Sequence, residues 1–267
     1  YSEDDFKTFG EFYKFALVQD GSEEGFFKVL QTKQNRPHYF PQKDLFIAEY
    51  NKKIIGFSDI TPELGIGRII VEGFVHPEYR QRGVATQLMG RVLPRGAKLG
   101  ARCYHFCIPE SSSITRKFLL KMGFSSVRCY LELKTDLSEA SEHGYNLSSS
   151  PISHLNKGDE AVLADIQNKI FSGSWGFCPN VPDDIRYYLD LTQSELEDIL
   201  LIKKGTETAG YLWPLMLSAR DLPSGRKQGC IHMFGVKAEF RGMGLGKELL
   251  SIGHIYLKRK GAGIVKL

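Results

Sequence analysis

The chain has 267 residues, of which 42% are hydrophobic and 25% are charged, and this globular composition excludes a disordered or collagen-like polymer. The formal net charge of +4 is too small and too dispersed to indicate a nucleic-acid partner. No apolar run reaches the roughly 18 residues that a membrane span needs, so we expect no membrane partner. Five scattered cysteines are unlike a disulfide framework, and the acidic N-terminus is no secretory signal. We therefore expect a cytoplasmic protein.

The first half of the chain predicts two helices, a β-hairpin, and a further strand that leads through a glycine turn into a helix. Another strand, a helix and a closing strand follow. Polar residues then replace the apolar pattern and indicate a domain boundary. The second half predicts a short strand, two helices, a hairpin, a strand, another glycine turn with its helix, and a last strand. The residues concerned are 2–17, 48–57, 114–122 and 125–133 in the first half, 134–144 at the boundary, and 145–147, 159–171, 202–211 and 230–236 in the second.

An internal repeat relates the two halves. Residues 75–85 align without a gap to residues 236–246, and the hairpin of residues 48–57 corresponds to that of residues 202–211. Two pairs of segments in the same order indicate a duplicated unit. We expect two domains, residues 1–140 and 141–267, and because each repeat lacks elements that the other has, we expect both ends of the chain to be trimmed.

The strand, glycine turn and helix form the most informative segment. Glycines allow a tight turn whose N–H groups can approach a ligand, and the start of a helix adds free donors and a positive dipole end. Such a turn can bind phosphate. Only three residues separate Gly242 from Gly246, which excludes a P-loop, and Leu249 stands where a dinucleotide-binding fingerprint needs a glycine.

Both turns carry the pattern Arg/Gln-x-x-Gly-x-Gly/Ala after a strand that ends in valine, at residues 80–85 and 241–246. The chain thereby resembles a tandem member of the GNAT acetyltransferase superfamily. Its second half, through residues 210–213 and 234–236, is similar to the C-terminal half of mycothiol synthases. The resemblance implies an α/β fold with a mixed sheet in each of two GNAT-like acyl-CoA acyltransferase domains.

The resemblance also implies a cofactor, acetyl-CoA (coenzyme A). Its pyrophosphate would lie on the turn amides, and its pantetheine arm would extend the sheet beside the preceding strand. Backbone N–H groups there would polarise the thioester carbonyl. The residues assigned to the cofactor are Phe74, Val75, Arg80, Gln81, Arg82, Gly83, Val84 and Ala85 in the first half, and Gly235, Val236, Arg241, Gly242, Met243, Gly244, Leu245 and Gly246 in the second.

The catalytic groups of the family are replaced in this chain. Many GNAT enzymes carry a glutamate base six residues before the final valine of the strand, where this sequence has Ile69 and Cys230. The usual tyrosine acid corresponds to Leu119. His232 lies two residues after Cys230 and has a suitable unperturbed pKa for a general base; a histidine packed within the sheet is the alternative. We therefore expect the first domain to be catalytically degenerate and the second to be catalytic.

Two further features concern the acceptor and metals. Trp175 and Phe177 lie in a loop between two helices, where GNAT folds build part of the acceptor site, although they could also merely cover the core. Cys103, His105 and Cys107 lie on one face of a predicted strand. The alternation of a buried strand explains this spacing better than a zinc site does, and we expect no metal site. The predicted function is N-acetylation of a small-molecule amine or a peptide N-terminus. A non-catalytic acetyl-CoA sensor or scaffold, or transfer of a longer acyl group, are the alternatives, and the oligomeric state stays open.

Overall fold

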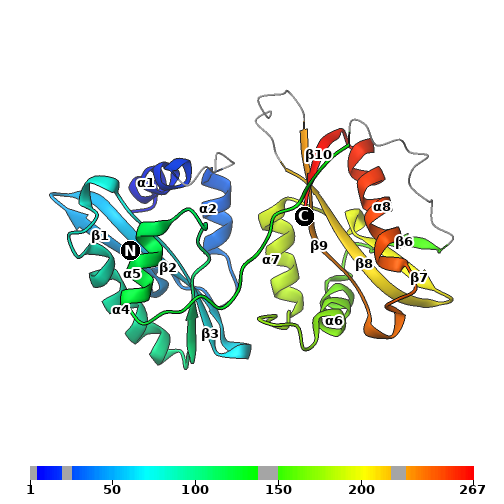
Figure 1. The fold of residues 1–267 in the computed structure, drawn as a ribbon, viewed down its shortest axis with the longest axis horizontal. Coiled ribbons are helices and arrows are strands. Elements are labelled where there is room, and N and C mark those ends of the chain that lie inside the picture. Colours follow the sequence, from blue (N-terminus) through cyan, green and yellow to red (C-terminus); the bar gives the residue numbers. More distant parts are fainter. Residues whose placement is uncertain (1–4, 20–25, 138–149, 218–226) are drawn as a thin grey trace. The chain divides into compact units, whose positions relative to one another are not determined.

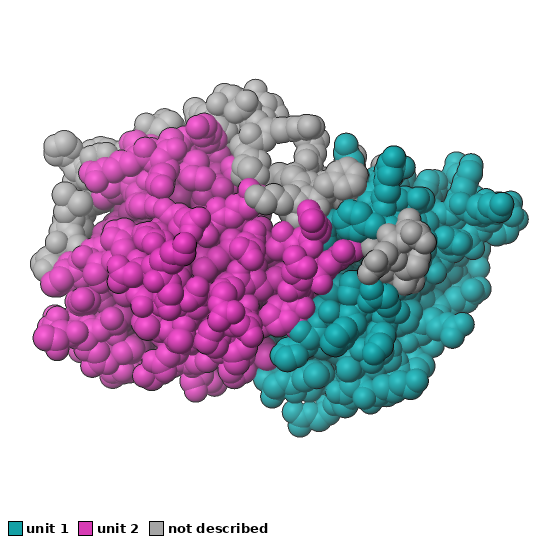
Figure 2. Space-filling view, turned by 180° about the vertical axis from the view of Figure 1, so that it is seen from behind, with its two compact units in different colours: residues 1–30, 38–131 teal, residues 31–37, 132–267 magenta. Residues whose placement is uncertain are grey.

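The computed structural model describes residues 5–19, 26–137, 150–217 and 227–267. The chain divides into two compact units (Figure 2). The first comprises residues 1–30 and 38–131, and the second comprises residues 31–37 and 132–267. None of the described helices is long and apolar enough to cross a membrane.

The first unit is built on a four-stranded mixed sheet in the order β1-β2-β3-β4. Three strands are antiparallel, and β4 runs parallel to β3. The strands are β1 (Leu45–Tyr50), β2 (Lys53–Glu63), β3 (Arg68–Val75) and β4 (Cys103–His105), and the helices of this half of the chain are α1 (Phe6–Gln19), α2 (Phe26–Gln34), α3 (Pro41–Asp44), α4 (Val84–Lys98) and α5 (Ser113–Lys121).

Helices cover both faces of this sheet (Figure 1). Alternate residues of a strand point to opposite faces, and the core residues follow this rule. Phe74 packs with the aromatic residues of α1, whereas Ile69 and Val71 pack with Met89 and Val92 of α4. The glycine turn between β3 and α4 is thus anchored by buried side chains on either side of it.

The second unit repeats this arrangement around a larger sheet in the order β5-β10-β9-β8-β7-β6. Its strand β9 runs parallel to β10 and antiparallel to β8. The elements are β5 (Lys134–Asp136), β6 (Ile152–His154), α6 (Glu160–Phe171), α7 (Pro182–Thr192), β7 (Leu200–Lys204), β8 (Glu207–Met216), β9 (Lys227–Val236), α8 (Leu245–Arg259) and β10 (Ala262–Lys266).

Two cores lie on the two faces of this sheet. Tyr211 and Trp213 pack against α6 and α7, while Leu212 and Ile231 pack against the apolar side of α8. Figure 1 shows α6 and α7 on one side of β8 and β9 and α8 on the other. The mixed-sheet fold with helices on both faces, predicted from the sequence, is confirmed in both units.

The predicted closing strand at residues 125–133 is wrong. These residues form no regular strand. The strand β5 begins only after them and pairs antiparallel with β10 in the second sheet. The Leu133 N–H donates to the Leu267 oxygen, and the Leu267 N–H donates to the Leu133 oxygen, each over 2.9 Å. Burial of Leu137, only 1% exposed in the α8 core, favours this pairing. The strand predicted at residues 145–147 lies outside the described residues.

Candidate active site

In each sheet, two parallel strands stop pairing before the first of them reaches the glycine turn. The parallel pairing of β3 with β4 ends at Ile70, although β3 continues to Val75. The pairing of β9 with β10 ends at Cys230, and β9 continues to Val236. Within the part of the chain that the structure describes, the diverging edge of each strand has backbone groups to which an extended ligand can add.

The two turns have the same backbone conformation. Gly83 and Gly244 precede α4 and α8 with φ angles of 80° and 82°, in the left-handed region. Two residues earlier, Gln81 and Gly242 have φ angles of 60° and 79°. The sequence repeat is therefore a structural repeat, with one non-glycine residue in the left-handed region of the first turn.

Both turns expose backbone donors to open space. A Cβ atom added at Gly83, Gly242 or Gly244 would meet nothing within 4 Å. The Glu248 N–H donates to the Gly244 oxygen as α8 begins, so the N–H groups between these residues point out of the helix end. Together with the helix dipole they form a site for an anion such as a pyrophosphate. The residues therefore fit the cofactor that the sequence implied.

The arginines that begin the two motifs hold the turns in place. The Arg80 Nε–H donates to the Val75 oxygen over 3.1 Å, and the Arg241 Nε–H donates to the Val236 oxygen over 3.0 Å. Arg241 also donates through Nη2 to the Ile170 oxygen over 3.0 Å. Each arginine thus ties the turn to the end of its strand, and in the second unit also to the end of α6.

The remaining predicted cofactor residues differ in exposure. Buried side chains anchor the turn from below and offer a ligand only their backbone, whereas exposed ones can reach it directly. Phe74, Val84 and Leu245 are buried; Val75, Ala85, Gly235, Val236 and Gly246 are half-buried; Gln81, Arg82 and Met243 are exposed.

A β-bulge changes the second strand where its sheet opens. Pro214 of β8 is opposite Ile231, and the preceding Trp213 is opposite Met233, so His232 is an extra residue in β9. Proline has no N–H for the ladder and is found in central strands at such irregularities. The bulge turns the backbone at His232 and breaks the alternation along β9.

His232 lies beside aromatic rings on the side of the sheet covered by α6 and α7. Its ring centroid is 5.0 Å from that of Trp213 and 6.4 Å from that of Tyr188. The side chain has an exposed surface, yet burial of the ring among its neighbours lowers its pKa below the usual 6.5. It is therefore neutral, and able to accept a proton, throughout the neutral pH range.

Cys230 shares this side of the sheet, where it packs against the α6 and α7 core. Burial raises the pKa of its thiol. The negative charge of Glu132 raises this pKa further, and the positive charge of Lys266 lowers it. A protonated thiol does not serve as a base, so the residue at the family's glutamate position has no basic role. In the first unit Ile69 is fully buried and Leu119 is 8% exposed, and neither can transfer a proton.

The predicted acceptor loop lies at the open end of β9. Phe171, at the end of α6, has its ring 5.4 Å from Phe177 and 6.5 Å from Tyr211. A Cβ atom at Gly235 would come within 2.4 Å of Ile170, which shows how closely α6 approaches this part of β9. Trp175, in the same loop, is 46% exposed and can contact a ligand.

Sequence reasoning missed the neighbours of His232. Nothing in a repeat pattern places Tyr188 of α7 beside β9, because their contact depends on tertiary packing. Pro214 was an available signal, since a proline inside a strand pattern points to a bulge or an edge.

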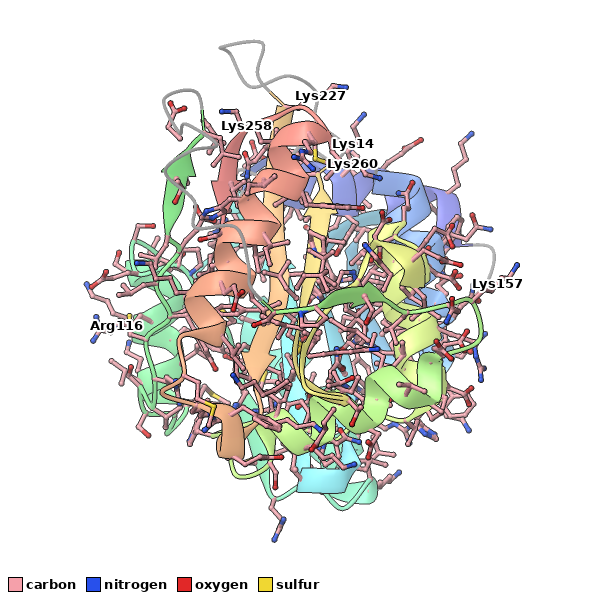
Figure 3. The ribbon with its side chains drawn as sticks, turned by 90° about the vertical axis from the view of Figure 1, so that its right-hand side faces the viewer. Lys14, Arg116, Lys157, Lys227, Lys258 and Lys260 are labelled. Atoms are coloured by element: carbon pink, nitrogen blue, oxygen red, sulfur yellow. The ribbon has the colours of Figure 1, made fainter. Side chains whose placement is uncertain are left out.

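The basic residues that end α8 lie away from the turn. Figure 3 shows Lys258 and Lys260 at the end of this helix, near Lys227 at the start of β9. The Lys260 ammonium donates to Asp198 over 3.2 Å and lies 5.3 Å from the centre of the Tyr256 ring. Cations at this end also interact favourably with the helix dipole.

Comparison with known protein families assigns the class that this fold and these turns define. Residues 41–126 match the description "Acetyltransferase (GNAT) domain", and residues 162–267 match "Acetyltransferase (GNAT) family". The chain belongs to the GNAT acetyltransferase family and carries two of its domains in tandem.

The chain is similar to two bacterial proteins named mycothiol acetyltransferase. It is 24% identical over 228 residues to that of Mycobacterium ulcerans (strain Agy99), covering 76% of this chain and 64% of the relative. It is also 24% identical over 236 residues to that of Amycolatopsis mediterranei (strain U-32), covering 84% and 75%. The chain thus spans less than two thirds of the length of the first relative.

Solved structures show the same fold across the chain. A GCN5-related N-acetyltransferase from Sphaerobacter thermophilus has a TM-score of 0.72 at 16% identity, covering 100% of this chain and 84% of that one. A tandem GNAT protein from the clavulanic acid biosynthesis pathway has a TM-score of 0.67 at 15% identity, covering 99% and 86%.

Proposed function

We propose that the protein is an acetyl-CoA-dependent N-acetyltransferase and that its second domain carries the reaction on a small-molecule amine or a peptide N-terminus. One arrangement supports this proposal. β9 diverges from β10 beyond Cys230, and a glycine turn follows the end of β9. His232 lies in the bulge, in the part of β9 between Cys230 and the turn. The first domain has the opening and the turn, but Ile69 and Leu119 stand at the family's base and acid positions and cannot transfer a proton.

The turn and the open strand edge bind and orient the cofactor. The N–H groups around Gly244 hold its pyrophosphate, and the backbone of β9 beyond Cys230 pairs with the pantetheine arm. A backbone N–H of β9 donates to the thioester oxygen and stabilises the negative charge that develops on it. Trp175 and Phe177 contact the acceptor.

His232 accepts the proton that the acceptor amine loses. The amine nitrogen bonds to the acetyl carbon, the carbon–sulfur bond breaks, and coenzyme A leaves as a thiolate. Water protonates the thiolate, and His232 returns its proton to that water. A base with a pKa below 6.5 is in its neutral form at pH 7, whereas Cys230, with its raised thiol pKa, remains protonated.

The decisive experiment measures release of free thiol from acetyl-CoA with a panel of amines and peptides. His232→Gln should lower turnover by about 10²–10⁴-fold with acetyl-CoA affinity unchanged. His254→Gln is the matched control, since His254 lies on α8 in the same unit and burial also lowers its pKa.

The pH dependence has a defined sign. Protonation removes the base, so turnover should fall as the pH drops below 6.5 through the lowered pKa of His232. The His232→Gln variant should lose this dependence. Normal turnover in that variant would exclude His232 as the base, while acetyl-CoA binding without turnover on any amine would favour the non-catalytic sensor. Faster reaction with longer acyl-CoA donors would favour an enzyme that transfers a longer acyl group.

A further inference from the structure

A row of aromatic and cationic side chains flanks the first turn. It contains Arg82, which the family resemblance assigns to the cofactor, and two tyrosines that have no role in the function proposed above. The ring of Tyr50 lies 5.9 Å from that of Tyr79, and the Arg82 guanidinium carbon lies 5.5 Å from the centre of the Tyr79 ring. Tyr50 is 56% exposed, Tyr79 is half-buried, and Arg82 is exposed. Flat rings and a cation are thus presented together at the surface.

Neighbouring side chains hold Tyr79 of this row in place. His76 lies 5.7 Å from Tyr79 and stacks on Phe15 at 5.0 Å, with an angle of 17° between the rings. The Glu78 N–H donates to Nδ1 of His76 over 3.3 Å. A tyrosine held in place by such contacts loses little conformational freedom when a planar ligand stacks on it.

The row lies directly beside the anion site. Arg82 precedes Gly83, from which α4 begins. A phosphate held by the turn amides would therefore lie within reach of a guanidinium, which favours phosphate as a partner through charge-assisted hydrogen bonds. The Tyr50 and Tyr79 rings lie next to that guanidinium and offer faces on which a purine can stack.

The second unit has a different set of side chains at the equivalent places. The repeat aligns Tyr50 with Lys204, Tyr79 with Phe240 and Arg82 with Met243. Phe240 packs into the α8 core, and Met243 is 55% exposed. The tyrosine–arginine row is therefore a property of the first unit, while the glycine turn is common to both.

We propose that Tyr50, Tyr79 and Arg82 clamp the phosphorylated adenosine end of coenzyme A, so that the first unit binds the nucleotide part of the cofactor more tightly than the second unit does. This inference rests on the cofactor part of the proposed function. It makes the first unit a site that holds coenzyme A without reacting with it.

The test uses the full chain with Gly244→Glu, which blocks the second turn, and titrates it calorimetrically with adenosine 3′,5′-bisphosphate. Tyr79→Ala should weaken binding by on the order of 10-fold, and Arg82→Gln by a similar factor. Tyr79→Phe should restore the affinity because it keeps the ring. Inorganic pyrophosphate, which has no purine, should bind equally to the parent and to Tyr79→Ala.

Phe40→Ala is the matched control in the same unit. Phe40 is a 54% exposed aromatic residue with Lys43 5.4 Å from its ring centre. It lies towards the far end of α4 from the turn, since its N–H donates to Asp44, which pairs with Arg95. This variant should bind the nucleotide like its parent.

Failure of the clamp and failure of the proposed function give different results. No binding of the nucleotide to the Gly244→Glu chain, or equal affinity in the parent, Tyr79→Ala and Arg82→Gln, would overturn the clamp. If the chain binds the nucleotide as expected but acetylates no amine, the clamp is supported and only the proposed function is overturned.

Discussion

The strands β3 and β9 occupy equivalent places in the two units and differ where a ligand would meet them. β3 pairs with β2 in unbroken register from Arg68 to Val75, whereas β9 contains a bulge at His232. The first turn is flanked by tyrosines and an arginine, and the second by Phe240 and Met243. The comparison separates two proposed tasks: the first unit carries side chains suited to a nucleotide, and the second carries His232, our proposed base, beside an open strand edge.

Blocking each turn in a separate variant gives the largest expected difference between the copies. Gly244→Glu should abolish turnover, because the new carboxylate fills the open space above the turn and repels phosphate, and its φ of 82° strains any side chain. Gly83→Glu should leave most turnover intact. Thiol release and calorimetry on both variants provide the measurement.

Gly205→Glu is the control for strain alone, since Gly205 has a φ of 61° in the hairpin between β7 and β8 with nothing within 4 Å of a Cβ atom. Loss of turnover in Gly83→Glu, with the second turn still binding acetyl-CoA, would move the reaction to the first unit.

The second sheet also has a strand that the first does not have, because the chain after the first unit supplies β5. Leu137→Ala should lower the free energy of unfolding of the second unit by about 2–5 kcal/mol, as buried leucines do, and Leu133→Ala, 59% exposed, should change it by under about 0.5 kcal/mol. Thermal and urea unfolding check both values. Equal effects would show that β5 does not pack on the second sheet in solution.

The bulge can be tested by making the second copy resemble the first. Pro214 corresponds to the fully buried Ile60 in the repeat. Pro214→Ile restores the missing N–H, favours a regular ladder and should turn His232 away, with turnover reduced about tenfold or more. Acetyl-CoA affinity should be unchanged. Wild-type turnover from a variant whose crystal structure has a regular ladder would show that the bulge is not needed.

The smallest expected effect concerns the two turns themselves. Gln81 has a left-handed φ of 60°, which costs a non-glycine residue about 1 kcal/mol, so Gln81→Gly should stabilise the first unit by up to about 1 kcal/mol. The reciprocal Gly242→Gln should destabilise the second unit by about the same amount. Chemical denaturation of both variants measures this, and a destabilised Gln81→Gly would indicate that the glutamine side chain supports the turn.

The parts of this molecule that depend on local chemistry could be predicted from the sequence. The strand, glycine turn and helix follow from residues adjacent in the chain, and a repeat made them visible twice. The bulge at His232 was not predicted, because it depends on the pairing of β9 with Pro214 on another strand. Residues 125–133 alternate like a strand, but alternation cannot say which sheet, if any, accepts them. His232, the other candidate site residues and the domain limits of 1–140 and 141–267 stay predictions.

The strand β5 has a consequence for how such a chain can be inherited or rearranged. The polar stretch of residues 134–144 looks like the natural place to separate the two repeats, yet a break there would split β5 from the sheet to which it belongs. A second unit transferred to another protein would have to carry the residues from Glu132 onward, including the Glu132 carboxylate that pairs with Lys266. The residues that follow the first repeat therefore belong to the sheet of the second unit, and recombination at the apparent junction would yield a sheet with an unprotected edge.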